Sequence, residues 1–168
     1  MALQKTVGLV PSLGVPGQQV VIGQAEYLSY NPLSDGTAKA GTFCFLTAGS
    51  GNGEVFAHAS LLGAAATDLP LGFVERVVDT RIESVTAEYT DTYPEGAALT
   101  VAIRGQFYIE APAALAADGL GVYINPLTGA INIDTAAGSG EVDTGFVCRL
   151  PNGATSCAQG DIVVIEKF

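Results

Sequence analysis

A run of alternating apolar and polar residues between positions 98 and 133 constrains the fold of this chain more than any other feature. Apolar side chains occupy every second position from Leu99 to Ile109, except at Gly105, and polar residues occupy the other register. This period of two predicts a half-buried β-strand. A glycine in the middle of the strand predicts a bend, a bulge or a close backbone approach, as in the curved strands of small barrels.

The same stretch continues into a predicted hairpin. Ala111-Pro112 ends the first strand, because proline has no N–H to donate to a neighbouring strand. Segments 121–124 and 130–133 then alternate again, on either side of the turn Asn125-Pro126-Leu127-Thr128-Gly129. A proline early and a glycine late in this turn favour a tight connection between two antiparallel strands.

Glycine and proline divide the rest of the chain into short segments. There are 21 glycines and 8 prolines in 168 residues, which leaves little room for long helices. The apolar segments between them, including 18–22 and 41–48, predict about nine or ten short strands. We therefore expect one all-β domain, a small β-barrel or sandwich over residues 25–168, large enough to form a core without disulfides or metals.

Residues 1–24 are predicted to be either an extended N-terminal arm or an edge strand of the same domain. This segment has one charged residue, Lys5, and it is unusually apolar for a chain terminus. An arm would place its apolar side chains on a neighbouring subunit and add a strand to that subunit's sheet. The candidate contact residues are Leu3, Val7, Leu9, Val10, Leu13 and Val15.

The charge composition argues against several classes of partner. Only 7 residues are Lys or Arg, the net charge is -10, and the basic residues are scattered, so nucleic acid is not an expected partner. Charged residues make up only 14% of the chain, which favours an assembly component that covers apolar surface with neighbours. No segment approaches the roughly 20 apolar residues of a membrane helix, and no signal peptide is recognisable. We expect a protein made and kept in the cytosol.

Neither a catalytic centre nor a cofactor is predicted. His58 is the single histidine, so the usual catalytic triads and metal ligand sets have no second imidazole, and we expect His58 to be structural or incidental. A group of carboxylates is close in sequence, but it falls in a polar strand and loop, where solvated charges are the expectation. These carboxylates are Asp79, Glu83, Glu88, Asp91 and Glu95.

The three cysteines are Cys44, Cys148 and Cys157, an odd number that fits a reducing compartment. A hairpin turning at residues 151–153 would bring Cys148 and Cys157 face to face. Buried free thiols are the first expectation, and a disulfide between these two residues is the alternative.

The order of motifs in the second half resembles the structural cement or head-decoration proteins of tailed bacteriophages. The motifs are Phe107-Tyr-Ile-Glu-Ala-Pro, an alanine-rich link, Asp118-Gly119, Val122-Tyr-Ile-Asn and a turn ending in Thr128-Gly129. The likeness covers about the last two thirds of the chain, with a weaker echo at residues 15–17 and 71–74. It implies a small β-barrel that binds the outside of an icosahedral capsid, commonly as a homotrimer, and reinforces joints between capsomers of the major capsid protein.

The resemblance also implies a location and a class of function. The protein would be a non-enzymatic virion component on the outer capsid surface, assembled in the cytoplasm of the host bacterium. The alternative is a carbohydrate-binding or tail-associated β module of a virion. A small hydrolase that uses the carboxylate group near Glu83 is the third interpretation.

Overall fold

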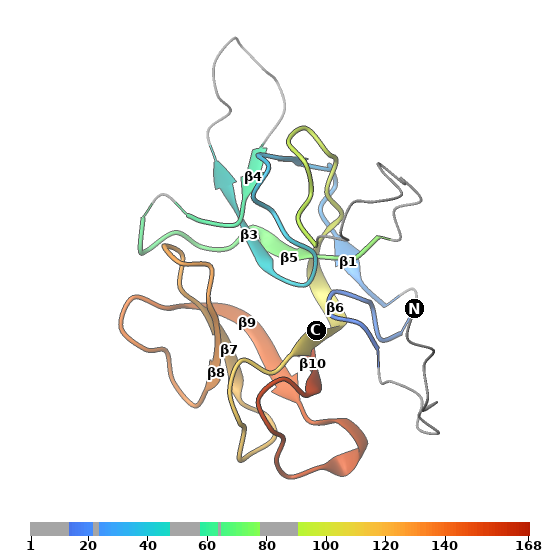
Figure 1. Cartoon of the computed structure of the whole chain (residues 1–168), viewed down its shortest axis with the longest axis vertical. Coiled ribbons are helices and arrows are strands. Elements are labelled where there is room, and N and C mark those ends of the chain that lie inside the picture. The colour runs from blue at the N-terminus through green and yellow to red at the C-terminus, as the bar shows by residue number, and fades with distance from the viewer. Residues whose placement is uncertain (1–13, 22–23, 48–57, 64, 78–90) are drawn as a thin grey trace, which may run out of the picture.

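The computed structural model describes residues 14–21, 24–47, 58–63, 65–77 and 91–168, and it confirms the all-β prediction (Figure 1). Within these ranges the regular elements are ten strands and one short 3-10 helix. They are β1 (Glu26–Tyr27), β2 (Leu33–Ser34), β3 (Phe43–Thr47), β4 (His58–Ser60), β5 (Gly72–Val74), β6 (Val101–Glu110), β7 (Gly121–Ile124), β8 (Ile131–Asp134), β9 (Val142–Arg149), η1 (Pro151–Gly153) and β10 (Ile162–Lys167).

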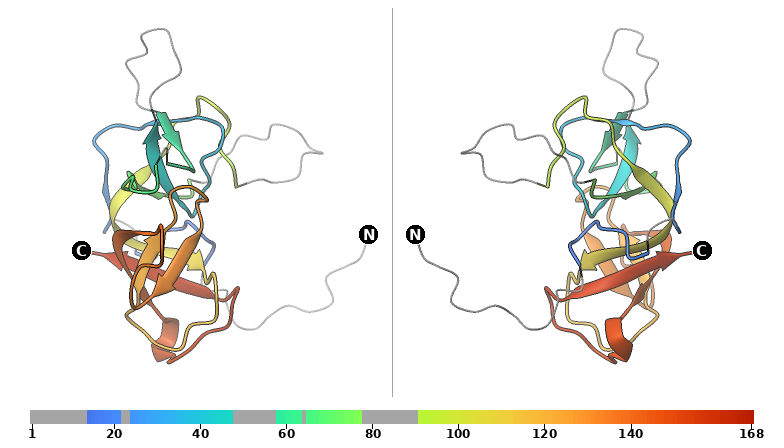
Figure 2. Two further views of the ribbon diagram at one scale, coloured as in Figure 1. Left: turned by 90° about the vertical axis from the view of Figure 1, so that its left-hand side faces the viewer. Right: turned by 90° about the vertical axis from the view of Figure 1, so that its right-hand side faces the viewer.

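The strands form one path of hydrogen-bonded neighbours in the order β2-β4-β3-β5-β6-β10-β9-β7-β8, and β1 also pairs with β6. The path has two ends, so the fold is an open, sandwich-like sheet rather than a closed barrel. Strands β1 to β5 lie in one half of the molecule and β7 to β10 in the other, with β6 passing between them (Figures 1 and 2). The β6 strand therefore holds the two halves together.

The β6 strand is buried along one face, as its alternation predicts. Val101, Phe107 and Ile109 are buried, whereas Arg104 and Glu110 are exposed. Its second half pairs with all six residues of β10. Near its start, Ala102 lies opposite a residue of β5 and a residue of β1. These flanking strands explain why Ala102 is buried although it falls in the polar register.

Gly105 lies at the predicted irregularity of β6, with a φ of 134°. The register between β1 and β6 shifts next to it, between Glu26 and Tyr27. A Cβ atom at Gly105 would lie 2.9 Å from the Cβ of Ala25 and 3.1 Å from a ring carbon of Phe107. Glycine is required here both for the backbone angle and for the close approach of residue 25.

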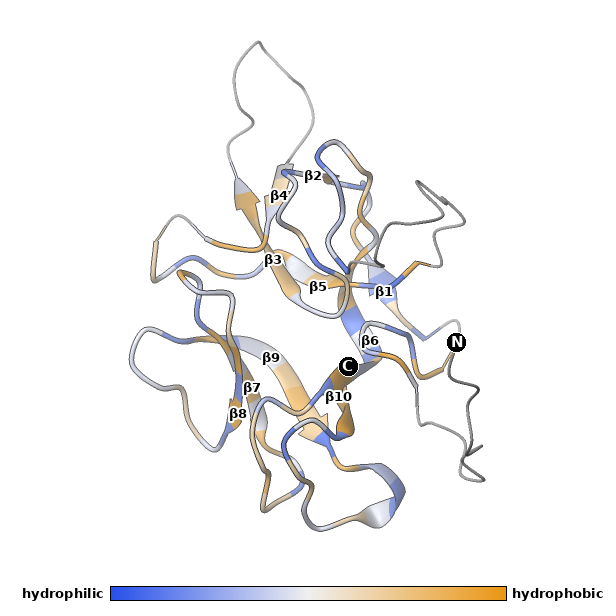
Figure 3. Cartoon of the chain, viewed as in Figure 1, coloured by the Kyte–Doolittle hydropathy of each residue, from blue (hydrophilic) through white to orange (hydrophobic). Residues whose placement is uncertain are grey.

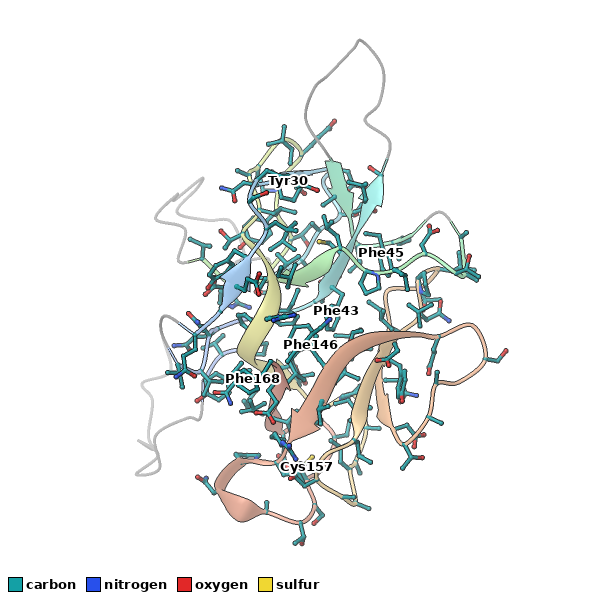
Figure 4. The ribbon with its side chains drawn as sticks, turned by 180° about the vertical axis from the view of Figure 1, so that it is seen from behind. Tyr30, Phe43, Phe45, Phe146, Cys157 and Phe168 are labelled. Atoms are coloured by element: carbon teal, nitrogen blue, oxygen red, sulfur yellow. The ribbon has the colours of Figure 1, made fainter. Side chains whose placement is uncertain are left out.

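Four phenylalanines from four strands make the centre of the larger core cluster. The ring of Phe43 on β3 lies 5.5 Å from that of Phe146 on β9 and 5.4 Å from that of Phe73 on β5, both edge to face. Phe107 on β6 completes the group, 4.9 Å from Phe73. Figure 4 shows Phe43 and Phe146 close together between the halves of the sheet. This shared core makes the two halves one folding unit.

The predicted hairpin is confirmed. Asn125 donates its N–H to the carbonyl of Ala130 at 2.9 Å and accepts the N–H of Gly129 at 2.8 Å, and Gly129 has a φ of 69°. The β7 and β8 strands leave this turn in register, with Ile124 opposite Ile131 and Gly121 opposite Asp134.

The strand predicted at Gln18 to Ile22 is wrong in extent. Only Gln19 forms a bridge, with Phe107, and Ile22 lies outside the described residues. Backbone hydrogen bonds join Gly17 and Gln18 to Tyr108 and Val20 to Gln106, so the segment follows the side of β6 for four residues. Its pairing ends where β6 becomes irregular near Gly105. The strand predicted from Gly41 forms as β3, starting at Phe43.

Candidate interaction surfaces

The described part of the N-terminal segment belongs to the domain itself. Residues 14–20 run along β6, and Gly14 lies against the ring of Tyr108. Arg76 also binds the segment, because its Nε donates a hydrogen bond to the carbonyl of Pro16 at 2.7 Å. Val15 is 47% exposed beside these contacts. The other five candidate contact residues, Leu3, Val7, Leu9, Val10 and Leu13, lie outside the described residues.

Most basic side chains of the described chain are engaged within the domain. Arg76 pairs with Asp91 at 2.7 Å, and Arg104 lies 3.6 Å from Glu26. Lys167 donates from Nζ to the carbonyl of Thr144 at 2.9 Å. These contacts leave few cations directed toward a partner.

Arg149 joins two carboxylates on the outer face of the sheet. Its Nε lies 2.6 Å from Oε1 of Glu166, and its Nη1 lies 3.2 Å from Oδ2 of Asp118. The pKa of Asp118 is lowered, mainly because Oδ1 accepts the N–H of Leu150 and then because of Arg149. The hydrogen bond from Arg149 likewise lowers the pKa of Glu166. The three residues connect the β6–β7 loop to β9 and β10.

The region from residue 105 to residue 148 contains no Lys or Arg. Its acidic side chains include exposed Glu110, Asp134 and Asp143, and half-buried Glu141. The strands β7 and β8 and the loop between β8 and β9 therefore form an acidic part of the surface. This surface would repel phosphate backbones and attract basic groups.

Exposed apolar side chains gather where the β4–β5 loop meets the β7–β8 turn. Leu62 and Leu127 are exposed by 39% and 53%, and the N–H of Gly63 donates to the carbonyl of Pro126 at 2.8 Å. Leu46 of β3 and Leu69 of the β4–β5 loop are also exposed. Figure 3 shows hydrophobic colour on the loops and on β3 as well as inside the sheet. Such side chains are suited to contact with another protein surface.

Tyr27 of β1 lies beside the N-terminal segment. Burial raises the pKa of its phenol, and a hydrogen bond with Glu75 raises it further. Its hydroxyl also lies 3.5 Å from Oε1 of Gln19. The phenol thus stays neutral and contacts Gln19 of the N-terminal segment and Glu75, which follows β5.

The expectation of free thiols is confirmed, although Cys157 is only partly buried. Burial raises the pKa of Cys44 to about 12. Burial raises the pKa of Cys148 to about 12 as well, with Cys157 as a secondary cause. Two of the thiols are therefore held protonated and unreactive at neutral pH.

Among the described residues there is no group of three or more His, Cys, Asp or Glu side chains that would hold a metal ion. Of the sequence-predicted carboxylate group, Asp79, Glu83 and Glu88 fall outside the described ranges, Asp91 pairs with Arg76, and Glu95 is exposed in a turn. His58 lies in β4, with its backbone beside Leu33 and Thr47. In the part of the chain that the structure describes, no helix is long and apolar enough to cross a membrane.

A family model described as "Structural cement protein (E217 gp24/Pam3 gp6)" matches residues 3–167. The chain belongs to the structural cement protein family. The resemblance inferred from the sequence is thus confirmed, and it extends over nearly the whole chain. Membership gives the protein a structural, capsid-associated role.

A solved structure shows that the fold also occurs in a phage capsid. The structure titled "The capsid of Myoviridae Phage XM1" contains a chain that is 17% identical in sequence to this chain, and the two folds superpose with a TM-score of 0.64. The match covers 99% of this chain and 97% of that one, so the similarity is in the whole fold. No curated protein matches the sequence.

Proposed function

We propose that this protein decorates the outer surface of a phage head and stabilises contacts between capsomers of the major capsid protein. The observation that carries the proposal is the family match over residues 3–167. The surface agrees with it, because basic side chains are largely neutralised locally and exposed leucines remain for contact. The protein acts as a virion component rather than as an enzyme, needs no cofactor, and assembles onto heads in the host cytoplasm.

The proposed mechanism is stabilisation by mass action. A subunit that binds the assembled shell but not separated capsomers stabilises each bridged site by RT ln(1 + [L]/Kd). Many such sites act on one shell, and a homotrimer would engage several of them at once, so release would require several interfaces to open together. Modest individual contacts are then sufficient to oppose the internal pressure of packaged DNA.

The N-terminal segment is part of the proposal. Its apolar residues would contact a neighbouring subunit, while residues 14–20 stay fixed on β6. The proposed contact residues are Leu3, Val7, Leu9, Val10, Leu13 and Val15.

The decisive experiment is co-sedimentation of the purified protein with undecorated heads, together with light scattering for its mass in solution. We expect saturable binding and a fixed copy number per shell. A folded β-protein of similar size and net charge serves as the control for protein that enters the pellet without binding to the heads. Absence of binding by well-folded protein would contradict the proposal for those heads, and a glycan-binding screen would then test the alternative virion module.

A further inference from the structure

Among the described residues, the outer edge of β8 has no paired strand, and β8 is one end of the strand path. β8 pairs with β7 along its full length, from Ile131 opposite Ile124 to Asp134 opposite Gly121. Asn125 and Ala130 are opposite each other and hydrogen-bonded, and in an antiparallel ladder every second pair is hydrogen-bonded. Asn132 and Asp134 therefore direct their backbone groups toward β7. The backbone groups of Ile131 and Ile133 therefore point outward, and within the described chain no residue pairs with them.

The other end of the strand path differs from β8 because it is covered. Leu33 of β2 forms a bridge with Ala98, and Ser34 exchanges backbone hydrogen bonds with Gly96 and Ala97. Natural sheets usually cover or interrupt an open edge, because its free N–H and C=O groups recruit other strands. The uncovered β8 edge is thus a place where an extended segment from elsewhere can add to the sheet.

The charge at this edge selects the kind of segment that fits. Asp134 ends β8, and Asn132 donates to Oε2 of Glu141 at 3.2 Å, which holds a second carboxylate beside the strand. Residues 105–148 include no Lys or Arg, and the two cations beside β9 are already engaged, Lys167 with the carbonyl of Thr144 and Arg149 with Glu166 and Asp118. A segment with a positive charge and no carboxylate would complement this edge.

The chain itself contains such a segment. Residues 1–13 include Lys5 and no Asp or Glu, and the first acidic residue of the chain is Glu26. Thr6 to Val10 is free of proline and lies between Lys5 and Pro11, so it is long enough to face the four residues of β8. In an antiparallel arrangement, Lys5 would come next to Asp134.

The position of this segment favours a second copy over its own domain. Phe107 of β6 is flanked by Gln19 on one side and by Ile165 of β10 on the other, so residues 14–20 lie at the edge opposite β8. Five strand spacings, roughly 24 Å, separate the two edges. Once residues 6–10 form a strand, only residues 11–13 connect that strand to residue 14, and this connection spans at most about 14 Å, which is too short to reach the β8 edge of the same sheet.

We infer that the β8 edge accepts residues 6–10 of a second copy as an added antiparallel strand, with Lys5 paired to Asp134. The donor and acceptor lie on opposite edges, so each copy gives a segment to one neighbour and receives one from another. Head-to-tail contacts give a ring when the rotation between neighbouring copies closes and an open filament when it does not, and the homotrimer implied by the family resemblance corresponds to a ring of three copies. The inference rests on the proposed arm contact, but it does not depend on shell binding.

The test uses the full chain in solution, as a mixture of ordinary and heavy-isotope-labelled copies. A carbodiimide, which joins an amine directly to a carboxylate, is added and the linked peptides are identified by mass spectrometry. We expect links between Lys5 of one copy and Asp134 or Glu141 of another, and a multimer by light scattering. Links confined to a single copy, or links from Lys5 only to other carboxylates, would overturn the inference.

Two variants test the contact itself. Ile131→Pro removes an N–H that points away from β7, so it should abolish the links and the multimer. Because the Ile131 side chain also packs against the core, circular dichroism checks that the variant is folded. Ala114→Pro is the matched control, since Ala114 is exposed and its N–H makes no hydrogen bond within the described chain. Lys5→Glu should weaken association about tenfold and reverse its salt dependence, because like charges then meet at Asp134.

The outcomes separate this inference from the proposed function. Shell binding by a protein that forms no Lys5 links to this edge would leave the decoration role standing and overturn the contact. Inter-copy links in a protein that does not bind undecorated heads would support the contact and contradict the decoration role. Equal association by Ile131→Pro and the unchanged protein would overturn the role of the β8 edge.

Discussion

Gly105 and Gly96 both have positive φ angles, 134° and 78°, but only Gly105 is surrounded by other atoms. An added Cβ at Gly105 would meet Ala25 at 2.9 Å, whereas an added Cβ at Gly96 meets nothing within 4 Å. We expect Gly105→Ala to lower the free energy of unfolding by about 3 kcal/mol, from backbone strain plus displacement of residue 25. Gly96→Ala, with strain alone, should lower it by about 1 kcal/mol. Urea unfolding curves measure both, and equal losses would contradict the importance of the close approach.

The thiols should differ in reactivity in the folded protein. Cys44 and Cys148 each have a pKa raised by burial to about 12, so at pH 8 they remain protonated and covered. Cys157 is partly exposed. Brief treatment with iodoacetamide should therefore modify Cys157 alone, and all three cysteines should react in urea. Peptide mass spectrometry identifies the sites. Rapid modification of Cys148 in the native protein would show that its surroundings open.

The Arg149 cluster should make stability depend on pH in the acidic range. The pKa values of Asp118 and Glu166 are lowered in the folded state, so their contribution to the stability of the fold is complete at pH values above their ordinary pKa values of 3.8 and 4.5. It is lost as the pH falls through the lowered folded values. Arg149→Met should thus melt a few degrees lower at pH 7, and the difference should shrink toward pH 3 and in high salt. A difference that is constant with pH would mean that Arg149 acts through packing.

At the scale of elements, β6, β3 and the β7–β8 hairpin could be predicted because each carries its own signal. The alternation of β6 and the glycine at position 105 are local, and so is the proline-to-glycine turn from Asn125 to Gly129. The strands β1 and β2 have only two residues each, too few to show a period. They exist because Tyr27 and Leu33 lie beside Ala102 and Ala98, which are distant in sequence.

Phe146 is the β9 contribution to the core that joins the two halves of the sheet. Its ring contacts Phe43 of β3 and lies near Phe73 of β5. We expect Phe146→Ala to lower the free energy of unfolding by about 4 kcal/mol, through lost burial and the remaining cavity. Phe168→Ala, at a residue that is 74% exposed, is the matched control and should change it by less than about 0.5 kcal/mol. Both are measured by chemical unfolding, and a two-step transition in Phe146→Ala would indicate that the halves unfold separately.

At the scale of the whole molecule, the sequence indicated the family and the kind of partner but not the surfaces. The apolar character of residues 1–24 predicted a contact segment, yet the attachment of residues 14–20 to β6 depends on Tyr108 and Arg76, far along the chain. The unpaired edge of β8 also had no local signal, because an edge is defined by strand order rather than by composition. The acidic character of that edge was readable, since no Lys or Arg occurs between residues 105 and 148.

Deletion of residues 1–13 tests the proposed arm at this scale. Residues 14–20 keep their hydrogen bonds to β6, so the melting temperature of the monomeric protein should change little. Shell binding should weaken at least about tenfold, because each buried Leu or Val contributes about 1.5–3 kcal/mol and about 1.4 kcal/mol already changes affinity tenfold. Co-sedimentation with undecorated heads measures the change. A variant of full length with serine at Leu3, Val7 and Leu9 is the control for chain length and should lose affinity in the same way. If the deletion instead lowered the thermal stability of the monomeric protein as much as it lowered binding, residues 1–13 would be an intrinsic strand of the domain, and the arm would have to be abandoned.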